Sequence, residues 1–98
     1  MRIWLDDVRP MPVGFDIHIK TAVDAIKLIT KEDVSYCSFD HDLGDEENGT
    51  GYDVANFIEE MAYYKIINPI QWAIHSANPV GRKNIEMAMK NAEKYWSE

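Results

Sequence analysis

Residues 38–51 read Ser-Phe-Asp-His-Asp-Leu-Gly-Asp-Glu-Glu-Asn-Gly-Thr-Gly, and an apolar run ends within them at Phe39. Directly behind it come Asp40 and His41, followed by a loop of glycines and acids that suits neither a strand nor a helix. In open parallel sheets, ligands bind in the crevice outside the carboxyl ends of the strands. The pattern therefore predicts a strand over residues 34–39 that delivers Asp40 to a functional site.

Two other apolar runs end in the same way. Leu5 runs into Asp6 and Asp7, and Ile74 runs into His75. If these strands lie parallel, their carboxyl ends meet at one edge of the sheet, so the polar groups that follow them converge. We expect to find there Asp6, Asp7, Asp40, His41, Asp42, His75 and Ser76.

The remaining segments alternate between strand and helix patterns. Residues 7–14 hold two prolines and a glycine, which exclude a helix. Residues 15–20 alternate between apolar and polar side chains, as an edge strand with one face in water does. His18 then points outward and is interpreted as a surface residue. A strand is expected over residues 2–5 and another over residues 70–74.

Helix starts are marked by side chains that cap helices well. Thr21, Thr50 and Asn78 hold these positions. The first helix is expected over residues 21–31, and the second carries an apolar stripe at helical spacing behind Thr50. The chain thus predicts four strands and three helices.

The predicted fold is one α/β domain, residues 1–98, with a four-stranded parallel sheet in the order 2-1-3-4. We expect a three-layer sandwich, in which right-handed crossovers place the first and second helices on opposite faces of the sheet. Ninety-eight residues with 46% hydrophobic content suffice for such a core.

Composition narrows the class of function. The single Cys37 sits in an apolar run, which indicates a buried thiol in a reducing compartment. No apolar run approaches the roughly 20 residues of a membrane helix, and no signal-peptide pattern is seen. A cytoplasmic protein without a membrane partner is expected. The net charge of -7 argues against binding along an extended duplex nucleic acid, but leaves small ligands and nucleic-acid ends open.

Carboxylates at strand ends favour a hard divalent cation. Neighbouring carboxylates repel each other unless a cation, an arginine or water offsets the charge. Asp6, Asp7 and Asp40 are therefore candidate ligands for Mg²⁺ or Mn²⁺. For Asp7, an ordinary loop acid is the alternative.

Histidines at two of the strand ends suggest acid–base chemistry. Imidazole titrates near neutrality, so His41 and His75 on opposite sides of a scissile bond could act as general base and general acid. The helix that starts at Pro79 offers unpaired N–H groups to an anion, and Arg82 could clamp a phosphate. The alternative for Arg82 is an exposed residue of the first turn.

Four motifs in order resemble the cyclic-phosphate processing receiver domain, a mostly phage and bacterial branch of the response-regulator receiver fold. The match spans nearly the whole chain. The motifs are Leu5-Asp6-Asp7-Val8-Arg9-Pro10, Phe39-Asp40-His41-Asp42-Leu43-Gly44, Thr50-Gly51-Tyr52-Asp53 and His75-Ser76-Ala77-Asn78-Pro79-Val80-Gly81-Arg82.

The resemblance implies roles for individual residues. Asp6 and Asp7 fall where receivers hold their metal-binding acids, Asp40 falls on the phosphoacceptor, and Ser76 lies near the hydroxyl residue that follows the fourth strand. The chain departs from ordinary receivers in two ways. A proline loop replaces the first crossover helix, and the fifth strand with its lysine is absent. Phosphorelay signalling is therefore not favoured, and His41 and His75 point to hydrolysis.

The resemblance thus implies a phosphoesterase, a hydrolase that processes a cyclic phosphate at an RNA end or in a nucleotide. His41, His75 and Asp40 are its expected catalytic residues. The expected phosphate-binding residues are Arg9, Ser76, Asn78 and Arg82. Two alternatives stay open: a non-enzymatic receiver-like module that binds metal or a nucleotide or is phosphorylated on Asp40, and a phage protein that sequesters a nucleotide.

Overall fold

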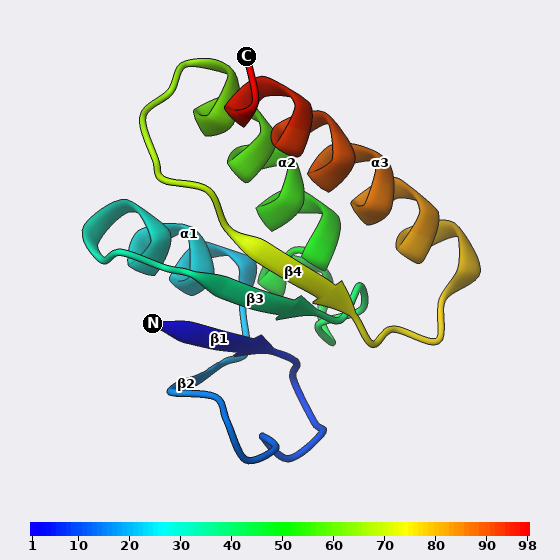
Figure 1. The fold of residues 1–98 in the computed structure, drawn as a ribbon. Coiled ribbons are helices and arrows are strands. Elements are labelled where there is room, and N and C mark those ends of the chain that lie inside the picture. Colours follow the sequence, from blue (N-terminus) through cyan, green and yellow to red (C-terminus); the bar gives the residue numbers. More distant parts are fainter.

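Strands and helices alternate along the chain in the computed structural model, which describes residues 1–98 (Figure 1). The three predicted helices and four predicted strands are all present. The first strand has its predicted bounds, the second is shorter than predicted at both ends, and the third and fourth start one or two residues later than predicted. In chain order the elements are β1 (Arg2–Leu5), β2 (Ile17–Ile19), α1 (Ala22–Lys31), β3 (Tyr36–Phe39), the 3₁₀ turn η1 (Glu46–Asn48), α2 (Gly51–Tyr63), β4 (Gln71–Ile74) and α3 (Pro79–Trp96).

The sheet is parallel throughout and has the predicted order β2-β1-β3-β4. In register, Leu5 pairs with Phe39 and Phe39 with Ile74. The backbone bonding continues one residue further, because the Asp40 N–H donates to the Leu5 carbonyl at 2.9 Å and the His75 N–H donates to the Phe39 carbonyl at 2.9 Å. The residues that follow the three strands are thus held side by side.

The predicted caps start the three helices. The Thr21 hydroxyl accepts from the Asp24 N–H. At Thr50 the capping box is complete, since Thr50 and Asp53 each accept from the other's backbone N–H, at 3.2 and 2.9 Å. The Asn78 side chain accepts from the Gly81 N–H at 2.9 Å, with proline at the first helical position.

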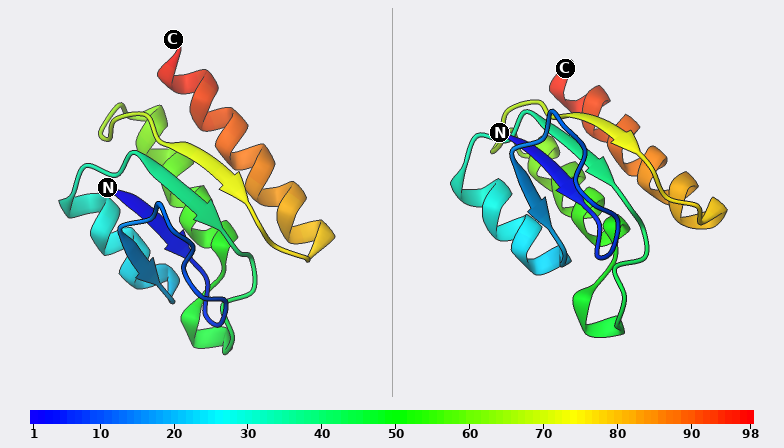
Figure 2. Two further views of the ribbon diagram at one scale, coloured as in Figure 1. Left: turned by 60° about the horizontal axis from the view of Figure 1, so that its bottom comes forward. Right: turned by 90° about the horizontal axis from the view of Figure 1, so that it is seen from below.

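The helices do not lie on opposite faces, so the predicted three-layer arrangement is wrong. α1 and α2 both cover the same face of the sheet, and α3 lies beside α2 along the β4 edge (Figure 2). The reason is the direction of the two crossovers. The chain moves from β2 to β3 and from β3 to β4 in one direction along the sheet, and right-handed crossovers in one direction place their helices on one face.

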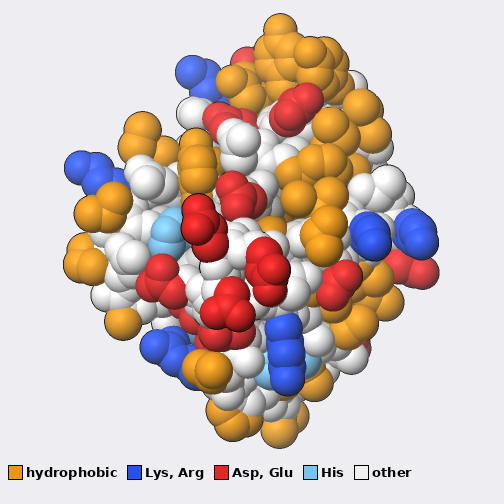
Figure 3. All heavy atoms as spheres, turned by 180° about the vertical axis from the view of Figure 1, so that it is seen from behind, with side chains coloured by type: hydrophobic (Ala, Val, Ile, Leu, Met, Phe, Trp, Pro, Cys, Tyr) orange, Lys and Arg blue, Asp and Glu red, His pale blue; other side chains and the backbone are white.

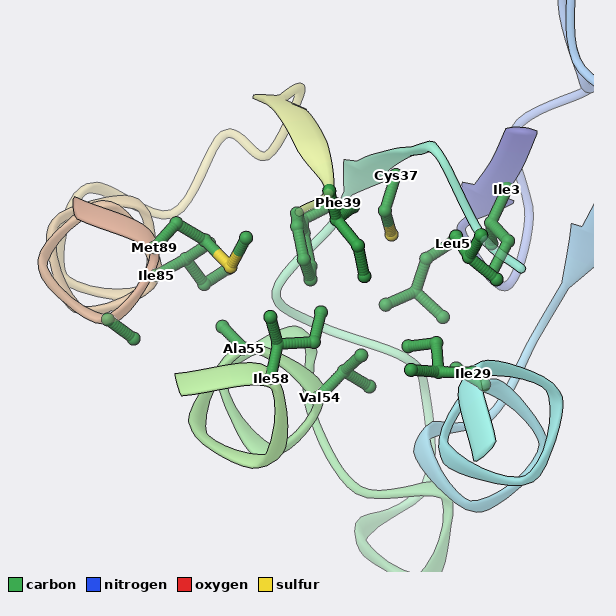
Figure 4. Packing of buried hydrophobic residues seen from close by; sticks show 14 of the residues in the cluster. Ile3, Leu5, Ile29, Cys37, Phe39, Val54, Ala55, Ile58, Ile85 and Met89 are labelled. Atoms are coloured by element: carbon green, nitrogen blue, oxygen red, sulfur yellow. The ribbon is translucent and has the colours of Figure 1, made fainter. Parts of the chain in front are cut away.

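The hydrophobic core fills the space between this face and the three helices (Figure 4). Leu5 and Phe39 point from the sheet toward α1 and α2, and Met89 reaches in from α3. All three side chains are fully buried. Cys37 is also fully buried, and burial raises the pKa of its thiol, which fits the predicted structural role.

The opposite face of the sheet has no helix. It carries the alternate residues of the strands, among them Trp4, Ser38 and His18. The loop between β1 and β2 covers part of it, and Phe15 from this loop packs edge-on against Trp4 with ring centroids 5.2 Å apart. Trp4 and Ser38 are consequently buried without a helical layer above them.

Seen from behind, the helical side shows acidic side chains gathered near its centre (Figure 3). Asp45, Glu46 and Glu47 around η1 are exposed. None of the helices combines the length and apolar composition needed to cross a membrane.

Candidate functional site

Three side chains meet at the carboxyl end of the sheet, on its helix-free face. Asp6, Asp40 and His75 follow β1, β3 and β4 and each offers a ligand atom within 4.8 Å of the others. Asp6 is fully buried and Asp40 is 8% exposed. The strand register explains this meeting, because the three residues occupy equivalent positions one step beyond paired strand ends.

Asp6 is fixed by hydrogen bonds to both carboxylate oxygens. Its Oδ1 accepts from the backbone N–H groups of Val8 and Arg9, at 2.8 and 2.7 Å. Its Oδ2 lies 2.9 Å from Nε2 of His75. Burial alone would raise the pKa of Asp6, but the Arg9 and Val8 N–H groups and His75 hold it below its usual value. Asp6 is therefore an anion in the folded protein.

His75 is held at both ring nitrogens and on one ring face. Its Nδ1 lies 2.8 Å from the Ser38 hydroxyl, opposite the bond from Nε2 to Asp6. The Trp4 indole stacks on the ring, with centroids 3.8 Å apart and planes 7° from parallel. Burial lowers the pKa of His75, although Asp6 and Asp40 partly oppose that effect. His75 is therefore neutral at pH 7.

Asp40 is the member of the group whose ionised form is least favoured by its surroundings. Burial raises the pKa of its carboxyl, and the nearby charge of Asp6 raises it further. The Ser76 hydroxyl and the His41 N–H, which donates to Oδ1 at 2.8 Å, only partly offset these effects. Two carboxylates so close together favour a bound cation or a shared proton.

Two predicted members of the site lie apart from this group. The Asp7 carboxylate faces Gly44, where a Cβ would come 3.1 Å from Asp7 Oδ2. The His41 ring packs beneath the first turn of α3, against Gly81, and its Nδ1 is buried without a hydrogen-bond partner. His75, rather than Asp7, thus joins the two carboxylates.

Two guanidinium groups border the cluster. Arg9 donates through Nη1 to the His75 carbonyl and lies with Nε 4.0 Å from Asp6 Oδ2. Arg82 donates through Nη1 to the carbonyls of Ile74 and Ser76, at 3.0 and 3.1 Å. In both arginines Nη2 makes no hydrogen bond within the protein. The two groups therefore brace the β4–α3 connection and keep donors for an anion.

The other predicted phosphate-binding residues make local bonds. Asn78 Oδ1 accepts the hydrogen bond that caps α3, and Asn78 Nδ2 lies 3.4 Å from Asp42 Oδ2. The Ser76 hydroxyl accepts from the Asn78 N–H at 3.1 Å. The His41 ring fills the space at Gly81, in the first turn of the helix whose N–H groups were expected to face an anion.

Ser38, Trp4 and His18 belong to the site but were missed. His18 is not a free surface residue, because its Nε2 lies 2.7 Å from the Asp6 carbonyl. Trp4 and Ser38 orient His75 from the middle of β1 and β3. A signal existed for Ser38, since a polar residue paired within a central strand needs a partner on one face of the sheet.

The chemistry of the donors fits a divalent cation. Two carboxylates and an imidazole could bind it, and a cation would relieve the repulsion that raises the pKa of Asp40. Carboxylates suit Mg²⁺ and Mn²⁺, and an imidazole among the donors shifts the preference away from Mg²⁺. To bind, Nε2 of His75 must give up its proton.

The comparisons with known proteins agree with the motifs. A family model described as the cyclic-phosphate processing Receiver domain matches residues 1–91. No curated protein and no solved structure gives a significant match. The sheet order and the three helices are those of a receiver-like α/β fold. On this match, which covers most of its length, the chain belongs to the cyclic-phosphate processing receiver domain family.

Proposed function

We propose that this domain hydrolyses a cyclic phosphate, at an RNA 2′,3′-cyclic phosphate end or in a cyclic nucleotide. The observation that carries the proposal is the group Asp6, Asp40 and His75, gathered at the carboxyl ends of the strands. Its mixture of a firmly ionised carboxylate, a carboxyl with a raised pKa and a neutral imidazole is typical of reaction centres.

Asp6, Asp40 and His75 would hold a divalent cation, with Mn²⁺ preferred over Mg²⁺. A cation there supplies Lewis acidity at the phosphoryl oxygen when bound. Arg9 and Arg82 would bind the phosphate through the Nη2 groups that the fold leaves without partners. The Ser76 hydroxyl lies beside Asp40 and would contribute a further hydrogen bond to the phosphate.

Asp40 would bind the cation in its ionised form and then could not donate a proton; without a cation it is our candidate for the proton donor to the departing ribose oxygen. A carboxyl that holds its proton to a higher pH than usual is suited to general acid catalysis. The contacts give less support to the predicted roles of His41 and His75 as general base and general acid. His75 is bonded at both nitrogens, and His41 lies beneath α3.

One assay panel tests the proposal. Cyclic nucleotides and RNA ends that carry a 2′,3′-cyclic phosphate are offered to the wild type with Mn²⁺ and with a chelator. We expect hydrolysis that the chelator abolishes. Asp40→Asn and His75→Ala should each lose about 10² to 10⁴ in rate. Asp42→Asn is the matched control, because Asp42 lies two residues away, is exposed, and its side chain hydrogen-bonds only Asn78.

Two outcomes would contradict this assignment. Hydrolysis that persists in both Asp40→Asn and His75→Ala would remove the cluster from the reaction. If the rate of hydrolysis is unchanged by the chelator but is lost in His41→Ala and in His75→Ala, acid–base catalysis by the two histidines is favoured instead.

A receiver-like module phosphorylated on Asp40 is the second candidate. It is favoured by the place of Asp40 at the end of a central strand, beside the Ser76 hydroxyl. Acetyl phosphate discriminates the two, because only this candidate expects a stable mass gain on Asp40. Tight binding of one nucleotide from the panel without turnover would indicate sequestration.

A further inference from the structure

Ser38 is an unusual residue for its position. It lies in the central strand β3, is 4% exposed, and its neighbours Cys37 and Phe39 are fully buried. Its hydroxyl faces the helix-free side of the sheet and meets His75 Nδ1 at 2.8 Å. A buried hydroxyl in a central strand costs stability unless it is hydrogen-bonded, and His75 is the partner that satisfies it.

The tautomer of His75 follows from its neighbours. The Asp6 carboxylate accepts at Oδ1 from the Val8 and Arg9 N–H groups and faces Nε2 of His75 with Oδ2, so Nε2 carries the proton that it shares with Oδ2. Nδ1 is then an acceptor, and the Ser38 hydroxyl donates to it. The stacked Trp4 ring keeps the imidazole from turning.

A bound cation requires the opposite tautomer. The Nε2 lone pair must face the cation, so the proton must sit on Nδ1. Because a hydroxyl both donates and accepts, Ser38 can accept from Nδ1–H as readily as it donates to Nδ1. Alanine at this position would leave a buried ring nitrogen unsatisfied in either tautomer.

We infer that Ser38 is the positioning residue of His75, and that its hydroxyl lets His75 exchange tautomers when a cation binds. Nε2 releases one proton to solvent and Nδ1 takes one up, so the imidazole stays neutral and no net proton is released. The inference rests on the cation site of the proposed function. It assigns no contact between Ser38 and substrate.

Ring ¹⁵N spectra of His75 test the exchange directly, with Zn²⁺ as a diamagnetic probe. We expect the metal-free wild type to show the Nε2–H tautomer and the Zn²⁺-bound protein the Nδ1–H tautomer. In Ser38→Ala, Zn²⁺ affinity measured by calorimetry should fall about 10- to 100-fold, as for other groups that orient metal ligands. In the same variant the metal-free ring should keep the Nε2–H tautomer, because Asp6 still accepts that proton.

Two variants serve as controls. Ser38→Thr keeps the hydroxyl and should restore most of the Zn²⁺ affinity. Ser35→Ala removes a hydroxyl that lies just ahead of the same strand and bonds only the Met1 carbonyl, and it should leave the Zn²⁺ affinity unchanged. If Ser38→Ala fails to fold, the two wild-type spectra and Ser38→Thr decide the question.

An Nδ1–H tautomer in the metal-free wild type, no Zn²⁺ binding, or an unchanged Zn²⁺ affinity in Ser38→Ala would each overturn the inference. None of these measurements uses a substrate. A chain that exchanges tautomers but hydrolyses no cyclic phosphate would refute only the proposed function. If the protein hydrolyses a cyclic phosphate but Ser38→Ala leaves its Zn²⁺ affinity unchanged, only the positioning role is refuted.

Discussion

At the end of β3, the Asp40 carboxyl is buried close to the charge of Asp6, and both effects raise its pKa. A folded-state pKa above the unfolded value means that the folded protein binds this proton more tightly. The contribution to stability is therefore full below the usual pKa of 3.8 and is lost as the pH rises through the folded value. At neutral pH the ionised Asp40 weakens the fold.

Asp40→Asn is thus expected to raise the melting temperature at pH 7, because it keeps the side-chain shape and cannot ionise. In a domain of this size, each 1 kcal/mol of added unfolding free energy raises the melting temperature by about 4–8 °C. The gain should shrink as the pH falls toward 3.8, where the carboxyl is protonated in both states. Thermal scans from pH 4 to pH 8, with Asp42→Asn as control, measure it. A gain that stays constant with pH would contradict this explanation.

Gly81 decides where the His41 ring lies. A Cβ at Gly81 would come 2.2 Å from His41 Cγ. Gly81→Ala should therefore destabilise the protein by roughly 1–3 kcal/mol, as overpacking does, although alanine is intrinsically better than glycine in a helix by about 1 kcal/mol. Urea unfolding provides the measurement. In the His41→Gly background, which also removes the His41 Cβ 2.6 Å away, the same substitution should become stabilising, and equal effects in both backgrounds would disprove the contact.

Helix caps are the element-scale features that the sequence predicts best. Thr21, Thr50 and Asn78 all cap as expected, because a cap depends on residues three positions apart and on little else. The strands were located by their apolar runs. Their order followed from short, right-handed connections.

Thr50→Ala should cost about 1 kcal/mol, and more than Thr21→Ala. Thr50 takes part in a complete capping box, whereas Thr21 only accepts the Asp24 N–H. Thr50 also forms the isolated bridge to Asp42, which ties the β3–α2 loop together. Chemical denaturation of the two variants gives the comparison. An equal loss in both would show that the second bond of the box contributes nothing.

On the scale of the whole molecule, the sequence located the site but not all of its parts. Strand ends predicted the meeting of Asp6, Asp40 and His75. The roles of Ser38 and Trp4 could not be read in the same way, because they depend on which face of the sheet lacks a helix. The helices were predicted on both faces of the sheet, whereas two right-handed crossovers in the same direction place them on one face. His41 was misplaced because packing against Gly81 is a contact between distant segments.

Cation binding should stabilise the entire fold, since only the folded chain brings the three ligands together. Mn²⁺ at 100 times its dissociation constant would add about 2.7 kcal/mol. We expect the melting temperature of the wild type to rise with Mn²⁺ and to fall back with a chelator. The 98 residues should melt in a single transition, as one domain does. Asp40→Asn should not respond to the metal, and an equal response in this variant would place the ion elsewhere.

The stacking of Trp4 on His75 has an optical consequence. An indole in contact with an imidazole loses its excited state more readily when the imidazole is protonated, so Trp4 emission depends on the state of His75. Trp72 and Trp96 lie elsewhere, where their indole N–H groups bond Glu93 and the Ile67 carbonyl. With these two replaced by phenylalanine, the fold would carry its own fluorescent reporter in β1, and events at the strand ends could be followed by light emission in real time without an attached dye.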